Sequence, residues 1–335
     1  MRFLVTGGAG FIGSHVADAL VGGGHEVVIL DDLSTGSREN IEHLLQDGQV
    51  ELVVGSVLEE DLVEECMRSV DACFHLAAVV GVRLVIEQTL DSIRSNALGA
   101  DTVFTLAARY GKRLLFASSS EVYGQGDGRP LTEGAHRAVG YRMHARWAYA
   151  SSKMYGEALA QSCVRELGSE MVVARLFNVV GPRQTGTYGM VLPRFVSQAL
   201  AGADLTVYGD GRQSRCFLHV DDAVQALLSL AGAHRAIGNV YNVGSPDAVR
   251  IVDLARLVIE RTGSTSGIRF VPFDVAYEPG FEDLEQRVPD TSAVHELIGW
   301  EAERTVEDAV RDVVRHLSRS QPAQAARTPT AADAV

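Results

Sequence analysis

The sequence predicts an α/β fold in which a doubly wound parallel sheet carries a smaller C-terminal α/β lobe. Two observations lead to it. Short, continuously apolar segments alternate with helical patterns through the first half of the chain, and after Arg175 this alternation gives way to short segments between Gly- and Pro-rich loops. Apolar strands separated by helices are typical of parallel sheets covered on both faces. The 335 residues suffice for a large core and two subdomains.

The strand signals of the first half come in the order that such a sheet requires. Residues 3–6 are a short apolar run, and glycines and a helical stretch over residues 14–21 follow it. Helical patterns separate the later strand signals, which lie at residues 27–30, 52–54, 72–76 and 113–117.

Two long helices are expected at residues 86–110 and 149–167. Each has more apolar positions than one face against a sheet requires. The spare faces either pair across a homodimer or lie buried within a single chain, and the sequence favours neither alternative.

The chain is expected to divide into two parts. Residues 1–177 would form mainly the sheet domain and residues 178–317 mainly the smaller lobe, with segments near 217–243 returning to the sheet domain. The segments expected to return are 217–220 and 240–243.

Composition and charge exclude several functions. The net charge of −13 argues against a broad nucleic-acid surface, and no apolar run is long enough to span a membrane. The first residues do not resemble a signal peptide, and the four cysteines form no CxxC pair. We therefore expect a cytoplasmic protein without a metal site. Residues 318–335 are rich in Ala, Pro, Thr and Gln and are expected to be disordered.

The segment 6-TGGAGFIG-13 indicates a dinucleotide site. It follows the first predicted strand and opens the first helix, and Gly7, Gly10 and Gly13 have the spacing GxxGxxG. Such a segment needs a tight turn, close approach of a pyrophosphate and close packing of helix on strand, and the helix start offers free N–H groups to phosphate. Asp31, at the end of the second strand, would bind the adenosine ribose and repel a 2′-phosphate, so the sequence predicts NAD rather than NADP.

Tyr149 and Lys153 stand at i and i+4 in 149-YASSK-153, on one face of a predicted helix. Together with the glycine segment and the serines of 116-FASSSEVYG-124, this pair resembles the short-chain dehydrogenase/reductase superfamily. The GxxGxxG spacing, the chain length and the second lobe resemble its extended branch, the NAD-dependent epimerases and dehydratases of nucleotide sugars. The resemblance covers about residues 1–315 and implies a Rossmann fold for the sheet domain.

The resemblance implies NAD as cofactor. In relatives an aspartate often follows the third strand and contacts the adenine amino group, whereas this chain has Ser56, whose hydroxyl accepts more weakly. The residues expected around the cofactor are Gly7, Gly10, Phe11, Ile12, Gly13, Asp31, Ser56, Val57, Leu76, Ala77, Ala78, Tyr149 and Lys153.

The resemblance also makes Tyr149 the acid/base. The Lys153 ammonium and the charge of the oxidised nicotinamide are expected to lower the pKa of Tyr149 from about 10 toward neutrality. Ser119 aligns with the hydroxyl that binds the reacting sugar oxygen, and its alternative role is a cap at a strand end. A cofactor-binding protein that had lost catalysis would have lost part of this set, and all three residues are present.

Segments of the second half resemble nucleotide-sugar enzymes, namely 175-RLFNVVGPRQ-184, 207-VYGDGRQSRCFLHVDD-222 and 241-YNVGS-245. They imply that Asn178 and Arg215 contact the substrate diphosphate, since a guanidinium matches phosphate oxygens. The alternative for Arg215 is a structural ion pair with Asp221 or Asp222. UDP is favoured as the nucleotide, and dTDP stays open.

Glu121 bears on which of three reactions follows oxidation at sugar C4. A 4,6-dehydratase needs an acid to expel the C6 hydroxyl, and Ser120 stands where dehydratases typically have that acid. A 4-epimerase needs neither group, and a carboxylate without a role is unfavourable in a buried site.

A UDP-glucuronate decarboxylase, which makes a UDP-4-keto-pentose or UDP-xylose for carbohydrate biosynthesis, fits the residues best. It resembles this chain in 118-SSSEVYG-124 and in 286-QRVPD-290. Arg287 would contact the substrate carboxylate or act near C5. Glu121 would favour loss of that carboxylate by repulsion, or hold a water that protonates C5. The catalytic set is thus Ser119, Ser120, Glu121, Tyr149, Lys153 and Arg287, with Asn178, Arg215 and Arg287 binding substrate.

Overall fold

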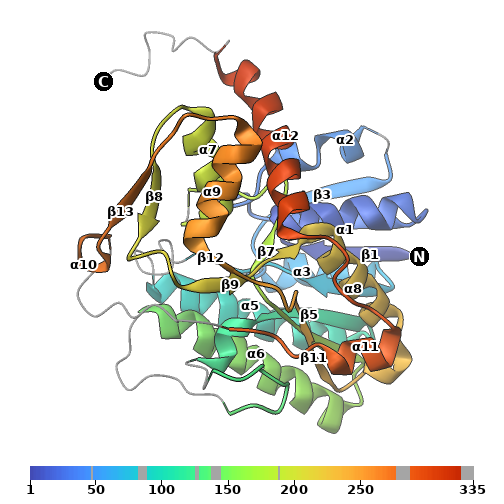
Figure 1. Ribbon diagram of the computed structural model, residues 1–335. Helices are drawn as coiled ribbons and strands as arrows, with labels where there is room; N and C mark the ends of the chain where they lie inside the picture. The colour runs from blue at the N-terminus through green and yellow to red at the C-terminus, as the bar shows by residue number, and fades with distance from the viewer. Residues whose placement is uncertain are drawn as a thin grey trace.

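A seven-stranded parallel sheet forms the centre of the fold (Figure 1), in the order β11-β6-β5-β4-β1-β2-β3. The computed structural model describes residues 1–46, 48–81, 89–124, 128–136, 145–187, 189–276 and 287–325. The strands of the sheet are β1 (Arg2–Thr6), β2 (Glu26–Asp31), β3 (Val50–Val54), β4 (Ala72–His75), β5 (Arg113–Ser119), β6 (Met171–Leu176) and β11 (Val240–Val243).

Short strand pairs and helices complete the described structure. The remaining strands are β7 (Val179–Val180), β8 (Leu205–Tyr208), β9 (Ser214–Cys216), β10 (Leu218–His219), β12 (Ala248–Arg250) and β13 (Ile268–Val271). The α-helices are α1 (Phe11–Gly22), α2 (Glu42–Leu45), α3 (Glu60–Arg68), α5 (Thr89–Arg109), α6 (Ala145–Leu167), α7 (Val191–Leu200), α8 (Val220–Gly232), α9 (Ile251–Thr262), α10 (Phe273–Ala276), α11 (Ser292–Ile298) and α12 (Val306–Ala325). Three short 3₁₀ helices are η1 (Arg38–Asn40), η2 (Ser120–Tyr123) and η3 (His234–Ala236).

Helices cover both faces of the sheet, as the continuous apolar strands predict. Along β2, Val27 and Ile29 pack into a core with α1, α8 and α11, whereas Val28 and Leu30 pack into a second core with α3, α5 and α6. The strands predicted in the first half are all present as β1 to β5, and the parallel α/β fold is confirmed. The first helix begins at Phe11 rather than at residue 14, because Gly10 is already its N-cap.

A third core lies in the smaller lobe, where α7, α9 and α12 pack around β8 (Figure 1). Of the two segments expected to return to the sheet, β11 lies beside β6. The prediction for residues 217–220 was wrong, because β10 pairs with β7 in a separate two-stranded sheet. The place beside β6 is taken by β11. The division at residue 177 stays a prediction.

The C-terminal tail differs from its prediction. Helix α12 continues to Ala325, so the expectation of disorder was wrong for residues 318–325, and residues 326–335 lie outside the described ranges. The physical reason lies before the tail: Val310 and Val313 anchor the helix in the core of the smaller lobe, and a helix propagates from such an anchor more easily than it starts. Pro322 opposes this extension by about 3 kcal/mol, so the last turns are the least favourable part of the helix.

Helices α5 and α6 pack against one face of the sheet and against each other. Residues 82–88 lie outside the described ranges, so the predicted helix start at residue 86 is not described. Leu98 and Tyr155 on these helices remain exposed, at 55% and 44%. Among the described residues, no helix is both long and apolar enough to cross a membrane.

Candidate active site

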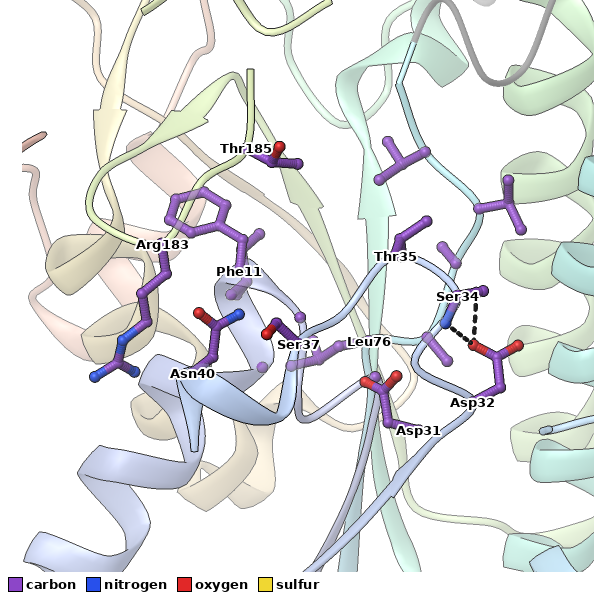
Figure 2. A pocket seen from close by; sticks show the side chains of 18 of the residues that line it. Phe11, Asp31, Asp32, Ser34, Thr35, Ser37, Asn40, Leu76, Arg183 and Thr185 are labelled. Atoms are coloured by element: carbon purple, nitrogen blue, oxygen red, sulfur yellow. Dashed lines mark hydrogen bonds between the residues drawn. The ribbon is translucent and has the colours of Figure 1, made fainter. Parts of the chain in front are cut away.

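A cavity of about 520 Å³ lies at the carboxyl ends of the sheet strands, where open α/β sheets bind their ligands. Figure 2 shows Phe11, Asp31 and Leu76 around it. Most of the predicted cofactor residues line it: Gly7, Gly10, Phe11, Ile12, Gly13, Asp31, Ser56, Val57, Leu76, Ala77 and Ala78. Tyr149 and Lys153 are not among the lining residues; from the strand that carries Ser119, Ala117 lines the cavity.

The glycine segment is shaped for a diphosphate. Gly7 has φ 70°, and a Cβ there would lie 2.7 Å from the amide nitrogen of Ala77. A Cβ on Gly13 would lie 2.1 Å from the Gly7 carbonyl oxygen. Helix α1 can therefore pack this close to the turn after β1 only because residue 13 has no side chain. The first turn of α1 has no acidic residue and no side-chain cap, which leaves its N–H groups to an anion. These residues fit a dinucleotide.

Asp31 is fixed for its predicted role. Its Oδ2 accepts the N–H of Ala9 and its Oδ1 that of Leu33, both at 2.9 Å. Burial raises the pKa of the Asp31 carboxyl, and these two hydrogen bonds oppose the shift. Each oxygen keeps a second lone pair, so the carboxylate can still accept hydroxyl donors.

Asp31→Asn is expected to weaken NAD binding roughly tenfold, about 1.4 kcal/mol, and to reduce the preference for NAD over NADP. An amide nitrogen at one of the two positions cannot accept the N–H of Ala9 or Leu33, nor a ribose hydroxyl. Fluorescence titration with both dinucleotides measures the change. Asp32→Asn is the control for charge: Asp32 also lines the cavity, but its Oδ1 already accepts from the N–H and the hydroxyl of Ser34. Equal weakening by both variants would mean that charge, and not contact, governs NAD binding.

Ser56 lies in the cavity wall but bonds within its own loop. Its hydroxyl accepts the N–H of Leu58 at 3.2 Å, and its N–H donates to Glu59 Oε1 at 2.7 Å. The side chain of Val57 packs against Gly99 of α5, where an added Cβ would lie 2.6 Å from Val57 Cγ2. The hydroxyl therefore stabilises the turn into α3 besides any contact to adenine.

Sequence reasoning missed part of the cavity wall. Arg183 lies in 181-GPRQ-184, which was noted for substrate enzymes and not for the cofactor, and its Nη1 lies 2.7 Å from Asp18 Oδ2 on α1. His316 comes from α12 and has no local signal in the sequence. The other missed lining residues include Ser34, Thr35, Ser37, Asn40, Gln184, Thr185, Met190 and Leu317.

Ser119 and Tyr149 meet at the end of β5. Ser119 is the last residue of that strand, and its Oγ accepts the N–H of Glu121 at 3.2 Å, so it caps η2 as well. The side chain of Ser119 lies close enough to the Tyr149 hydroxyl to lower the pKa of Tyr149. The pair predicted from separate segments is thus in contact, and the capping alternative for Ser119 also holds.

Lys153 lies one turn after Tyr149 and is buried, at 4% exposed. Its Nζ donates to the Ala117 carbonyl at 2.8 Å and lies 5.9 Å from the centre of the Tyr149 ring. It also lies 4.7 Å from the centre of the Phe116 ring. Burial lowers the pKa of Lys153 to about 7, although Glu157 acts in the opposite direction.

The pKa of Tyr149 does not follow the expectation within the protein alone. Burial raises it first, the Glu121 carboxylate raises it further, and the hydrogen bond to Ser119 lowers it. The predicted lowering therefore depends on a positive charge brought to the site, because the protein's own groups together act the other way.

The Lys153→Met variant is expected to lose a pH-dependent stability change. The unfolded chain keeps the Lys153 proton up to about pH 10.5 and the folded chain only up to about pH 7, so the free energy of unfolding rises with pH between these values. Wild type should gain up to about 3 kcal/mol more than the variant from about pH 7 to 9 in urea unfolding. Lys112→Met, at the chain's other lysine, should follow wild type. A Lys153→Met curve parallel to wild type would contradict the lowered pKa.

Glu121 and Arg287 form an ion pair beside Tyr149. Arg287 Nη2 donates to Glu121 Oε1 at 2.5 Å, with the two side chains 3% and 23% exposed. Arg287 Nη1 is buried without a hydrogen-bond partner in the described part of the chain. Buried donors are rarely left unmatched, so this nitrogen is suited to a ligand oxygen. Ser120 is buried next to this pair in η2, at 3% exposed.

Asn178 turns the chain between β6 and β7. It has φ 35°, in the left-handed region, and its Nδ2 donates to the Cys216 carbonyl at 3.0 Å. Its amide nitrogen thus joins the turn to the end of β9, and its carbonyl oxygen has no role in that contact. The predicted diphosphate contact of Asn178 stays a prediction.

Arg215 lies on β9, where its Nη1 donates to the Ser214 carbonyl at 2.8 Å. The aspartates considered as alternative partners bind elsewhere. Asp221 pairs with Arg304 at 3.0 Å, and Asp222 Oδ2 accepts the N–H of Arg304 at 2.8 Å. Its predicted contact to a diphosphate also stays a prediction.

Comparisons with known proteins agree with this geometry. The family described as "NAD dependent epimerase/dehydratase family" matches residues 3–244. The chain is 37% identical over 315 residues to the UDP-N-acetyl-alpha-D-glucosaminuronate decarboxylase of Bacillus cytotoxicus, which covers 94% of this chain and 97% of that protein. It is 35% identical over 327 residues to UDP-glucuronic acid decarboxylase 1 of Danio rerio, covering 97% of this chain and 74% of that one.

A solved structure adds a relative with a different reaction. The UDP-glucuronic acid 4-epimerase from Bacillus cereus, in complex with UDP-glucuronic acid and NAD, superimposes with a TM-score of 0.85 at 25% identity. The match covers 96% of this chain and 100% of that one.

Proposed function

Since this chain belongs to the NAD-dependent epimerase/dehydratase family, we propose that it decarboxylates UDP-glucuronate to a UDP-4-keto-pentose, UDP-xylose or both. The observation that carries the proposal is the Glu121–Arg287 pair next to Ser119 and Tyr149. Decarboxylation needs a site that oxidises C4 and a second site that handles the C6 carboxylate, and these two pairs supply both.

The first step would be oxidation at C4. NAD held in the cavity supplies a hydride acceptor. The Tyr149 phenolate would take the proton of the C4 hydroxyl, and Ser119 would hold that oxygen by a hydrogen bond. Lys153, buried behind Tyr149, would stabilise the phenolate while it is protonated.

The second step would act on the carboxylate. With a ketone at C4, the C5–C6 bond breaks, its electron pair moves toward the C4 oxygen, and CO₂ leaves. The unmatched Nη1 of Arg287 would hold the carboxylate. Because the charge of Glu121 is balanced by Arg287, we favour for Glu121 the role of holding a water that passes a solvent proton to C5 as CO₂ leaves, over a role in repulsion.

A 4-epimerase for the same substrate is the second candidate. It is favoured by the likeness to the Bacillus cereus UDP-glucuronic acid 4-epimerase. The two reactions share C4 oxidation and differ in the fate of the carboxylate. A dehydratase is disfavoured because Ser120 is no carboxylic acid.

Asn178 and Arg215 would bind the diphosphate, Arg215 as the stronger contact because of its charge. The Bacillus cytotoxicus relative is named for an N-acetylated substrate, so the test should include both uronates. Wild type with NAD⁺ is incubated with UDP-glucuronate, UDP-N-acetylglucosaminuronate or UDP-glucose, and the products are weighed by mass spectrometry. Loss of the mass of CO₂ from a uronate is expected, with UDP-glucose unchanged in mass. Uronate isomers of unchanged mass would favour the epimerase.

We also propose that the enzyme is a cytoplasmic homodimer. Leu98 on α5 and Tyr155 on α6 leave an exposed apolar area that a second copy can cover. All four cysteines are buried and unpaired, which suits a reducing compartment. Light scattering gives the mass in solution, and a mass of one chain would contradict the dimer.

A further inference from the structure

A chain of four buried polar side chains lies outside the cavity wall. Both Oε atoms of Glu157 accept from Arg175, Oε1 from Nε at 2.9 Å and Oε2 from Nη2 at 2.8 Å. Arg175 Nη1 donates to the Tyr123 hydroxyl at 2.7 Å, and that hydroxyl donates to Asn242 Oδ1 at 2.6 Å. None of the four is more than 1% exposed. We call these four residues the buried chain.

One end of the buried chain lies beside the C4 oxidation site. Glu157 follows Lys153 by one turn of α6, and it raises the pKa of Lys153 against the effect of burial. The Ser118 hydroxyl, next to Ser119 on β5, donates to Glu157 Oε1 at 2.6 Å. This end is therefore tied to the strand and the helix that carry the oxidation site.

The other end holds the segment that begins with Arg287. Asn242 Nδ2 donates to the carbonyls of Leu131, at 2.7 Å, and Asp290, at 3.1 Å. The Leu131 N–H donates to the Val288 carbonyl at 2.8 Å, and the Asp290 N–H donates to the Leu131 carbonyl at 2.9 Å. The segment thus has backbone partners on one side and the Asn242 amide on the other.

Two side chains of the 3₁₀ helix η2 hold residues 287–290, one directly and one through Asn242. Glu121 pairs with the side chain of Arg287, and Tyr123 acts through Asn242 on the carbonyl of Asp290. Because η2 is only four residues long and directly follows Ser119, these two contacts together fix the distance between the Arg287 guanidinium and the end of β5.

Stability alone does not account for the buried chain. Replacing a buried ion pair by apolar side chains of similar volume is often neutral or stabilising, so such a pair is weak evidence for a stabilising role. Every nitrogen of the Arg175 guanidinium donates here, and a fully satisfied buried network specifies one arrangement of its parts.

We propose that Tyr123 and Asn242 are positioning residues for Arg287. Through them the Glu157–Arg175 pair holds residues 287–290, so that the Arg287 guanidinium stays opposite Glu121 with one nitrogen turned to the substrate. The inference rests on the proposed function, in which Arg287 binds the carboxylate that is lost.

Tyr123→Phe tests it, because the ring stays and only the hydroxyl is lost. In single turnovers with UDP-glucuronate and NAD⁺, CO₂ release is expected to fall roughly 10- to 100-fold, since small misplacements slow reactions strongly. C4 oxidation, followed by nicotinamide absorbance, should change less than about threefold, so that the 4-keto uronate accumulates. Ser118→Ala, which removes a bond only at the Lys153 end, should leave the ratio of the two rates at its wild-type value.

Hydrogen exchange gives a readout that needs no substrate. In Tyr123→Phe, the Asp290 amide should exchange faster while the amides of α6 keep their protection. Asn242→Asp, which keeps an acceptor for Tyr123 and loses the donor to Leu131 and Asp290, should give the same result. Asn242→Asp also serves as the test if Tyr123→Phe does not fold. Loss of amide protection throughout both variants would mean that the buried chain is needed for folding, and that result would overturn the proposal.

The remaining outcomes separate the alternatives. An equal fall of both rates would mean that the buried chain acts through Lys153, and unchanged rates with unchanged exchange would mean ordinary packing; either overturns the proposal. If wild type releases no CO₂ from UDP-glucuronate, the proposed function fails, and the exchange of the Asp290 amide still decides whether Tyr123 and Asn242 hold the segment.

Discussion

Tyr149→Phe should slow C4 oxidation roughly 10²- to 10⁴-fold, the usual contribution of a general base. The phenyl ring keeps the packing on α6 but cannot take the C4 hydroxyl proton, and it lacks the hydroxyl whose pKa the Ser119 side chain lowers. Single-turnover absorbance of the reduced nicotinamide measures this step. Binding of NAD should change little, because Tyr149 does not line the cavity.

The matched control for this prediction lies on the same helix. Tyr155→Phe removes a half-exposed hydroxyl that donates to Asp101 at 3.3 Å. The Tyr155→Phe variant should oxidise the substrate at C4 at the wild-type rate. If Tyr149→Phe kept more than about a tenth of the wild-type rate, another group would have to be the base.

Glu121→Gln should separate the two steps of the reaction. Glutamine keeps an oxygen for Arg287 Nη2, so the guanidinium stays in place. Its neutral amide polarises the water at C5 less than the carboxylate does, and protonation of C5 accompanies the loss of CO₂ in the proposed step. We expect C4 oxidation within a few-fold of wild type and CO₂ release slowed roughly 10²- to 10⁴-fold. Mass spectrometry should then find the 4-keto uronate, and reduced nicotinamide should persist.

The same variant has a consequence for the pH dependence. The Glu121 carboxylate raises the pKa of Tyr149, so its removal should lower that pKa and let oxidation persist at lower pH than in wild type. An oxidation rate that falls as far as CO₂ release would place Glu121 in the first step and contradict its assignment to the second.

Local patterns in the sequence predicted the parts of the site that depend on one segment. The glycine segment, Asp31 and the Tyr149–Lys153 pair each lie within one strand–helix unit, where spacing determines geometry. His316 lines the cavity because α12 packs in the core of the smaller lobe with one side chain reaching the cavity wall, and no local pattern in the sequence predicts such packing.

Two predictions from the sequence were wrong because tertiary packing, which has no local signal, determines the structure of those segments. Residues 217–220 read as a sheet strand, but β11 lies beside β6. The tail is poor in apolar residues, yet α12 continues into it from a packed core. The lowering of the Tyr149 pKa that was predicted from Lys153 and the nicotinamide charge stays a prediction, and burial by the whole fold, which acts against it, has no local signal in the sequence.

The most direct test of the account is the fate of C6. UDP-glucuronate labelled with ¹³C at C6 is incubated with wild type and NAD⁺, and labelled CO₂ is measured in the headspace along with the nucleotide sugars. The account predicts that label leaves as CO₂ in step with the appearance of an unlabelled UDP-pentose or UDP-4-keto-pentose. Label retained in a UDP-uronate with a changed C4 configuration would contradict it and make the chain an epimerase.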